Sequence, residues 1–164
     1  MPPLTPHDLG RLYRQHAPAL RLYARQWPGC GEDVVHDAFV ALARQSPPPE
    51  QVLPWLYRVV RTGAAAAARS AARRRRREGT ASAPEAWFAP ADDRLDAQDA
   101  ARALAELPLD LREVIVARLW GGLTFDEVAR LVGCSLPTAH RRYHAGLDEL
   151  RTRLDAPCTR TPTT

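Results

Sequence analysis

The segment from Thr124 to Leu154, TFDEVARLVGCSLPTAHRRYHAGLDELRTRL, decides the fold class because its spacing fits one supersecondary motif. Thr124 and Glu127 stand in the register of a capping box, which predicts that a helix begins there. Gly133 follows the apolar residues of that helix, where a positive φ commonly ends one. Ser135 is then a favourable N-cap for a second helix. Two helices joined by a turn of about three or four residues that contains glycine make a helix-turn-helix.

The second helix of this motif carries the residues that suggest DNA binding. An apolar stripe predicts its buried side, with members at Leu136, Ala139, Tyr143, Leu147, Leu150 and Leu154. The predicted DNA contacts cluster near its start: Ser135, Thr138, His140, Arg141, Arg142 and His144. In a helix-turn-helix this end enters the major groove, where arginine pairs with guanine or holds a phosphate. The alternative is solvated charge on a surface helix; the preceding turn favours DNA contact.

Composition sets the broad class. The chain has 164 residues and a formal charge of +4, and all 23 of its basic residues are arginine. No apolar run approaches the length of a membrane span and no signal peptide opens the chain, so we expect a cytoplasmic protein with no membrane insertion. The three cysteines, Cys30, Cys134 and Cys158, are expected to be reduced thiols. Cys30 and His36 alone are too few to hold a metal, and no metal or cofactor is predicted.

Helical patterns fill the rest of the chain, and no strand pattern or internal repeat is present. Amphipathic helices are predicted from residue 5 or 7 to 27, with a bend or break at Pro18, and from 33 to about 45. A long helix is predicted over residues 54–78, with Gly63 as its weak point. Two further helices are predicted over residues 96–107 and from Asp110, as its cap, to Trp120.

These helices divide into two groups. The predicted fold is all-α, with two small helical domains joined by a linker and a helix-turn-helix in the second. The expected domains are residues 1–78 and 97–155, with a linker at 79–96 that is small, acidic and proline-bearing, and a disordered tail at 156–164. Within the linker, Trp87 and Phe88 are unusual for a free segment and are expected to dock on a domain or a partner.

Five consecutive arginines, Arg73–Arg77, end the long helix of the first domain. Positive charge at a helix C-terminus is compatible with the helix dipole, so solvated charge is one explanation. A phosphate-binding surface, with affinity that depends on salt, is the other.

Four segments together resemble the extracytoplasmic-function group of bacterial RNA polymerase sigma factors, and the similarity runs from His7 to Leu154. LYRQHAPALRLYAR (12–25) resembles the start of their second region, EDVVHDAFVALAR (32–44) the segment that docks on the β′ clamp helices, and PWLYRVVR (54–61) the part that melts promoter DNA. Residues 103–147 resemble their fourth region, which binds the minus-thirty-five element. The family usually has asparagine and aspartate where this chain has Thr62 and Ala66, and commonly glycine and lysine at Pro137 and His140.

The resemblance implies a sigma factor that binds core polymerase, through the β′ clamp helices and the β flap, together with promoter DNA. It also leaves room for an anti-sigma factor. The implied polymerase contacts are Asp33, Asp37 and Phe39. The implied contacts with the melting strand and its phosphates are Trp55, Arg58, Arg61, Thr62, Arg69, Arg73 and Arg74. For Trp55, an ordinary place in the core is the alternative.

Two other classes of function are alternatives to a sigma factor. A free-standing helix-turn-helix regulator would bind a palindromic operator as a dimer, but the sequence suggests no dimer interface. An enzyme would need a catalytic set, and the five histidines show no pairing with a nucleophile or with metal ligands. No catalytic residue is therefore predicted.

Overall fold

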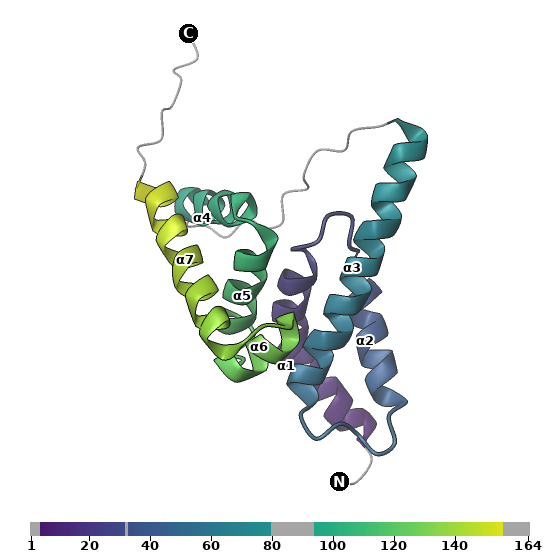
Figure 1. Ribbon diagram of the computed structural model, residues 1–164. Coiled ribbons are helices and arrows are strands. Elements are labelled where there is room, and N and C mark those ends of the chain that lie inside the picture. Colours follow the sequence, from purple (N-terminus) through teal and green to yellow (C-terminus); the bar gives the residue numbers. More distant parts are fainter. Residues whose placement is uncertain (1–3, 32, 80–93, 156–164) are drawn as a thin grey trace.

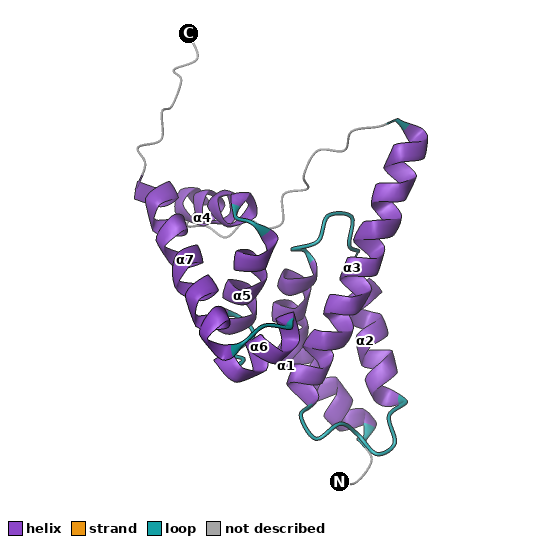
Figure 2. Cartoon of the chain, viewed as in Figure 1, coloured by secondary structure: helices purple, strands orange, loops and turns teal. Residues whose placement is uncertain are grey.

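The computed structural model describes residues 4–31, 33–79 and 94–155, with residues 94–99 described by their backbone only. Helices account for all the regular secondary structure of these residues: α1 (Pro6–Ala24), α2 (Asp33–Ala43), α3 (Val52–Glu78), α4 (Arg94–Glu106), α5 (Leu109–Leu119), α6 (Phe125–Val132) and α7 (Leu136–Asp155) (Figures 1 and 2). The all-α prediction is confirmed. Residues 80–93 of the expected linker, with Trp87 and Phe88, and the whole expected tail lie outside the described residues.

Helix α1 runs through Pro18 without a break, which corrects the break considered from the sequence. Its start is fixed by a capping box in which the Thr5 hydroxyl accepts from Asp8 N at 3.2 Å. Proline removes the hydrogen bond that the carbonyl of Arg14 would accept. Both Arg14 and Pro18 are exposed, so water can satisfy that carbonyl at little cost.

The N-terminal half, residues 4–79, packs α1, α2 and α3 against one another. Its core is made of fully buried side chains from all three helices, including Leu20, Val35, Leu42, Leu56 and Val60. Packing explains why glycine stands at position 63, the expected weak point of α3. A Cβ atom there would lie 2.9 Å from Val34 Cγ1, so glycine lets α3 approach α2 closely.

The C-terminal half, residues 94–155, packs α7 across α4, α5 and α6. Gly146 of α7 is buried against α5, and a Cβ atom there would lie 2.6 Å from Ile115 Cδ1. The N-cap of α5 is Pro108, and Asp110 lies in the first turn without capping it, which corrects the sequence prediction. Asp110 still carries favourable negative charge at that helix start.

The two halves lie against each other, and their buried side chains form one continuous hydrophobic cluster. Helix α1 contacts α5, and α3 contacts α6 (Figure 1). The C-terminal part of α3 projects beyond the other helices in this view. Among the described residues, no helix is both long enough and apolar enough to cross a membrane.

Candidate nucleic-acid interface

Local hydrogen bonds build the helix-turn-helix as the sequence predicted. Thr124 Oγ1 accepts from Glu127 N at 3.2 Å, and Thr124 N donates to Glu127 Oε2 at 2.7 Å. Gly133 ends α6 with a φ of +72°, a conformation that glycine adopts without strain. Ser135 Oγ then accepts from Thr138 N at 3.3 Å and caps α7. The turn therefore sets the direction of α7 from residues that are close in sequence.

One side of α7 is open to solvent along its first three turns. The exposed members of this surface are Pro137, His140, Arg141, His144, Ala145 and Asp148, and we call it the outer face of α7. The opposite side is buried at Ala139 and Gly146. The predicted apolar stripe was wrong at its two ends, since Leu136 is 43% and Leu154 48% exposed.

His140 of the outer face packs among aromatic side chains of α6 and α7. The rings of His140 and Phe125 are stacked with centroids 3.8 Å apart and an interplanar angle of 28°. Tyr143 meets the edge of the same Phe125 ring at 5.2 Å, and the Arg118 guanidinium lies 5.0 Å from its centroid. These contacts hold His140 in place against α6, so its imidazole is ordered before any DNA arrives.

The two arginines of α7 have different environments. Arg141 is exposed, and its Nη2 donates a long hydrogen bond of 3.5 Å to Thr138 Oγ1. Arg142 is 30% exposed and forms an ion pair with Asp110 of α5, with Nε and Oδ2 3.5 Å apart. Thr138 is half-buried and shares a 2.8 Å hydrogen bond with the Ser135 hydroxyl. The outer face thus presents Arg141, while Arg142 lies on its flank.

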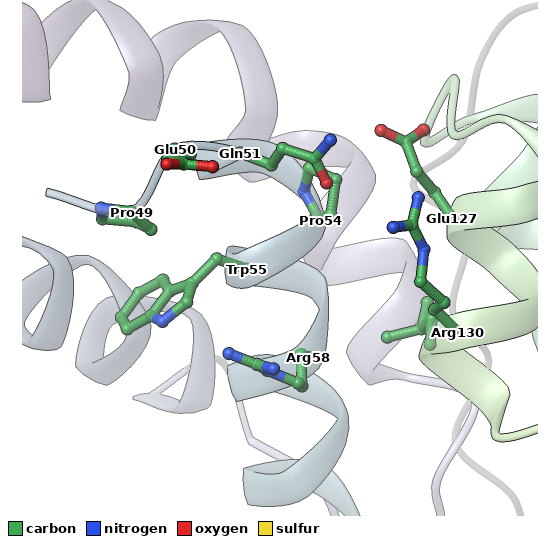
Figure 3. Close-up of a pocket in the computed structure, with 9 residues that line it drawn as sticks. Pro49, Glu50, Gln51, Pro54, Trp55, Arg58, Glu127 and Arg130 are labelled. Carbon is green, nitrogen blue, oxygen red and sulfur yellow. The ribbon is translucent and has the colours of Figure 1, made fainter.

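A second surface lies on α3. We call the side that carries Trp55, Arg58, Arg61 and Thr62 the strand-facing surface, after the role that the sequence predicts. Trp55 is half-buried and Arg58 exposed, and both line a cleft of about 410 Å³. The other wall of this cleft belongs to α6, where Glu127 and Arg130 face across it (Figure 3). The Thr62 hydroxyl donates to the carbonyl of Arg58 at 2.9 Å.

Arg61 differs from its neighbours because it is paired with the C-terminal half. Its Nε and Nη2 donate to Glu113 Oε2 and Oε1 at 2.9 and 3.2 Å, and Tyr23 Oη donates to Oε2 at 3.4 Å. Hydrogen bonding to Glu113 raises the pKa of Arg61. Burial, with the Glu113 charge as the next cause, raises the pKa of Tyr23 well above its usual range. The tyrosine is therefore protonated, as a donor must be.

Exposed arginines continue along α3 beyond this surface. Arg69, Arg73 and Arg74 are all exposed, on the part of the helix that projects in Figure 1. Among the described residues, none of these three arginines forms an ion pair, so their charge is available to an anionic partner.

The expected polymerase contacts all lie on α2. Asp33 and Asp37 are exposed on α2. Phe39 is only 7% exposed, because its ring packs edge-on against Tyr13 at 4.9 Å. Together with Leu9 and other residues of α1 and α2, Phe39 and Tyr13 line an apolar groove of about 540 Å³. Phe39 thus forms part of a groove wall, and the two aspartates are the freely exposed members of the set.

The residues that join the two halves were not predicted from the sequence. Glu113 looks like an ordinary charged position of an amphipathic helix, yet it is 4% exposed. Arg112 donates to the carbonyl of Gln26 at 3.0 Å, and Gln26 is 2% exposed. No local pattern marks these positions, because their partners are far away in the chain.

The fold and these surfaces define a class of protein: a two-part helical protein with a helix-turn-helix in one part and a long, arginine-rich helix in the other. Family models match both parts, Sigma-70 region 2 at residues 12–78 and Sigma-70, region 4 at residues 97–150. The chain therefore belongs to the sigma-70 family, and these two regions are the pair found in its extracytoplasmic-function group. It is a sigma factor, which binds core RNA polymerase and promoter DNA and directs transcription initiation; the family acts without catalysis of its own.

Solved structures show the same fold. The sigma factor RpoE in complex with the anti-sigma factor NepR from Bartonella quintana matches with a TM-score of 0.74 at 23% identity, over 92% of this chain and 98% of that one. CnrH in complex with the cytosolic domain of CnrY matches with a TM-score of 0.61 at 24% identity, over 93% and 91%. No curated protein matches the chain by sequence.

Proposed function

We propose that the two halves divide the work of promoter binding, with residues 1–78 contacting polymerase and the melted strand and residues 97–155 binding the upstream element. The observation that carries this division is the outer face of α7, which is exposed, basic and backed by the stack of His140 on Phe125. A recognition helix needs these properties, since its N-terminal residues must reach base edges while its other side is anchored.

Within α7, Arg141 is our candidate for the base contact. It is exposed and has one long hydrogen bond to give up, so it can turn toward a guanine at little cost. Arg142 is our candidate for a phosphate contact, because its pairing with Asp110 holds it on the flank of the outer face. His140, His144, Ser135 and Thr138 complete the proposed upstream contacts.

On α3 we assign the strand-facing surface to the unwound promoter strand. The half-buried Trp55 offers an aromatic ring for base stacking, and Arg58 offers an exposed guanidinium beside it. Stacking and cation contacts of this kind hold single strands with little regard to sequence. Arg69, Arg73 and Arg74 would then bind backbone phosphates, which fits their exposure and their lack of ion pairs with other described residues.

For polymerase binding we propose α2 and its groove. Asp33 and Asp37 supply exposed negative charge on α2, the helix whose Phe39 lines the apolar groove together with Tyr13. An apolar groove and exposed acidic side chains on the same helix suit the β′ clamp helices, which the resemblance implies as the docking site. The β flap would then contact the C-terminal half. Because polymerase and chromosomal DNA are cytoplasmic, we place the protein there and assign it no catalytic role.

We also propose that an anti-sigma factor controls this chain. The support is the similarity to RpoE and CnrH, whose structures contain NepR and the cytosolic domain of CnrY.

Run-off transcription tests the function directly. The purified chain is added to core polymerase on genomic fragments, and we expect discrete transcripts that core polymerase alone does not make. The double variant Asp33→Asn, Asp37→Asn should weaken binding to core polymerase, since it removes two charges from the docking surface. The control Asp148→Asn, Asp155→Asn makes the same charge change on α7 and should leave core binding intact. Equal effects of the two double variants would contradict the assignment of α2.

A further inference from the structure

The contact between the two halves centres on one buried carboxylate. Glu113 of α5 is 4% exposed, and it accepts three hydrogen bonds from the N-terminal half: two from Arg61 and one from Tyr23. The two bonds from Arg61 use the planar fork of the guanidinium, which is the strongest geometry for an arginine and a carboxylate. A buried charge is tolerated only when it is paired in this way, so Glu113 depends on Arg61.

Two further contacts lie around this pair. Arg112 Nη2 donates to the carbonyl of Gln26 at 3.0 Å, again from the C-terminal half to the N-terminal half. Tyr57 is fully buried with its hydroxyl against Gly121, where a Cβ atom would lie 2.6 Å from Tyr57 Oη. The halves therefore fit closely at a site where the chain has glycine.

The interface is nevertheless costly to keep closed. Gln26 Oε1, Tyr57 Oη and Arg112 Nε are buried and have no hydrogen-bond partner among the described residues. Burial of such a group without a partner costs about 1–3 kcal/mol. If the halves separated, these atoms and the charged groups of Arg61 and Glu113 would be solvated by water. These unpaired groups and buried charges offset part of the stabilisation from the apolar side chains that the two halves share, so the contact can open reversibly.

The closed contact also competes with DNA. Arg61 belongs to the strand-facing surface, yet its Nε and Nη2 both donate to Glu113. Trp55 and Arg58 lie in a cleft whose opposite wall is α6 of the helix-turn-helix half (Figure 3). A phosphate can replace a carboxylate at the same guanidinium fork, but one fork cannot hold both. Single-stranded DNA and the C-terminal half therefore exclude each other at this surface.

Promoter geometry adds a second conflict. Elements near minus ten and minus thirty-five are about 25 base pairs apart, or roughly 85 Å at 3.4 Å per base pair. In the closed arrangement, Arg61 of one half touches Glu113 of the other. The two halves cannot both be on their elements while this contact persists.

From these contacts we propose that Arg61 and Glu113 form an ion-pair latch, which holds the strand-facing surface closed against the C-terminal half and must open before both halves engage a promoter. The gating of DNA rests on the function proposed above for α3, whereas the latch itself rests on the contacts alone. The device acts in this chain without a further protein. Any partner that binds only the separated halves, such as polymerase or DNA, shifts the balance to the open state.

The distance between the halves tests the latch in the full chain. Spin labels are attached to cysteines introduced at the exposed positions Ser70 and Thr152, after the three natural cysteines are replaced by serine, and the distance distribution is measured by pulsed electron resonance. Glu113→Gln keeps the shape of the side chain but removes the charge that Arg61 holds. We expect the ratio of open to closed molecules to rise about tenfold in this variant, because a bond to a charged partner is lost.

A matched control separates the latch from a general charge effect. Glu149→Gln makes the same charge change within α7, where Glu149 pairs with Arg153 of the same helix. It should leave the distance distribution as in the parent. Tyr23→Phe removes only the hydroxyl that donates to Glu113 and should open the chain to a smaller extent. If Glu113→Gln fails to fold by circular dichroism, Tyr23→Phe carries the test.

The second measurement is the affinity for a fluorescent single-stranded oligonucleotide of mixed sequence. An affinity that is limited by a minor open state rises in proportion to that state, so we expect up to a tenfold gain for Glu113→Gln over Glu149→Gln. Equal distance distributions for these two variants would overturn the latch. An opened chain with unchanged DNA affinity would overturn its gating of DNA. Run-off transcription by the unaltered chain is scored separately, so a failure of the sigma function is distinguishable from a failure of the latch.

Discussion

The sharpest consequence of the structure is a difference between two adjacent arginines. Arg141→Ala removes an exposed side chain whose hydrogen bond to Thr138 Oγ1 is long, at 3.5 Å, so the variant should fold normally. If Arg141 pairs bidentately with a base, its loss should cost about 1–3 kcal/mol on the preferred upstream element. It should cost little on a scrambled one, because the lost bonds are specific to the base.

Arg142→Ala should behave differently. Its partner Asp110 is 52% exposed and Arg142 is 30% exposed, so the ion pair contributes at most about 1 kcal/mol to folding. As a phosphate contact, Arg142 should contribute about equally to both DNAs. Its loss should also reduce the slope of log affinity against log salt by about 0.9.

The assay compares holoenzymes that carry each variant on a preferred and a scrambled upstream element at two salt concentrations. Asp110→Asn is a useful control, because it frees Arg142 without altering α7, and it should raise affinity slightly on both DNAs. A change in the preference between the two DNAs with Arg142→Ala, and not with Arg141→Ala, would contradict the roles assigned to these arginines. If neither variant changes it, α7 does not distinguish sequences.

Three further predictions concern charge, packing and pH. Replacing several arginines within Arg73–Arg77 by alanine should weaken binding to all DNA sequences and flatten its salt dependence; a sequence-selective loss with an unchanged slope would contradict this. Gly146→Ala should destabilise the fold by up to about 2 kcal/mol in chemical denaturation, because the new methyl group meets Ile115 at 2.6 Å and overpacking outweighs the gain in helix propensity. Gly10→Ala is the control: its Cβ meets only a side-chain atom at 3.5 Å, so it should stabilise α1. Burial lowers the pKa of His16 below 6.5, so the unfolded chain takes up a proton first and the free energy of unfolding should fall as the pH drops below about 6.5. His16→Gln should remove this part of the dependence, and an unchanged pH profile would count against it.

Much of the helix-turn-helix could be predicted from sequence because its determinants are local. The capping box of Thr124 and Glu127, the left-handed Gly133 and the cap at Ser135 join residues at most four positions apart. Local geometry of this kind is encoded by residue type and spacing, and the structure has each feature where the spacing predicted it. The same holds for α3, which ends at Glu78 with Gly79 in the left-handed conformation.

Other features were decided by what each side chain packs against. The spacing of Arg141 and Arg142 could not assign their environments, since only the position of α5 brings Asp110 to Arg142. Phe39 could not be assigned to a groove wall before α1 supplied Tyr13. Pro18 predicts a break by its chemistry alone, yet the helix continues because that turn faces water.

The sequence by itself determined the helices and the helix-turn-helix, because these depend on hydrogen bonds and apolar periodicity within a few residues of the chain. It also indicated the family, through the resemblance of four segments to a known group. The closed contact between the halves was decided only by the tertiary structure. Arg61 and Glu113 are 52 residues apart, and Tyr23 and Glu113 are 90. A charged residue on an amphipathic helix has the same local sequence pattern whether its charge is solvated by water or paired with an arginine. Only the packing of α5 against α1 and α3 buries Glu113, and burial is what makes it dependent on its partner.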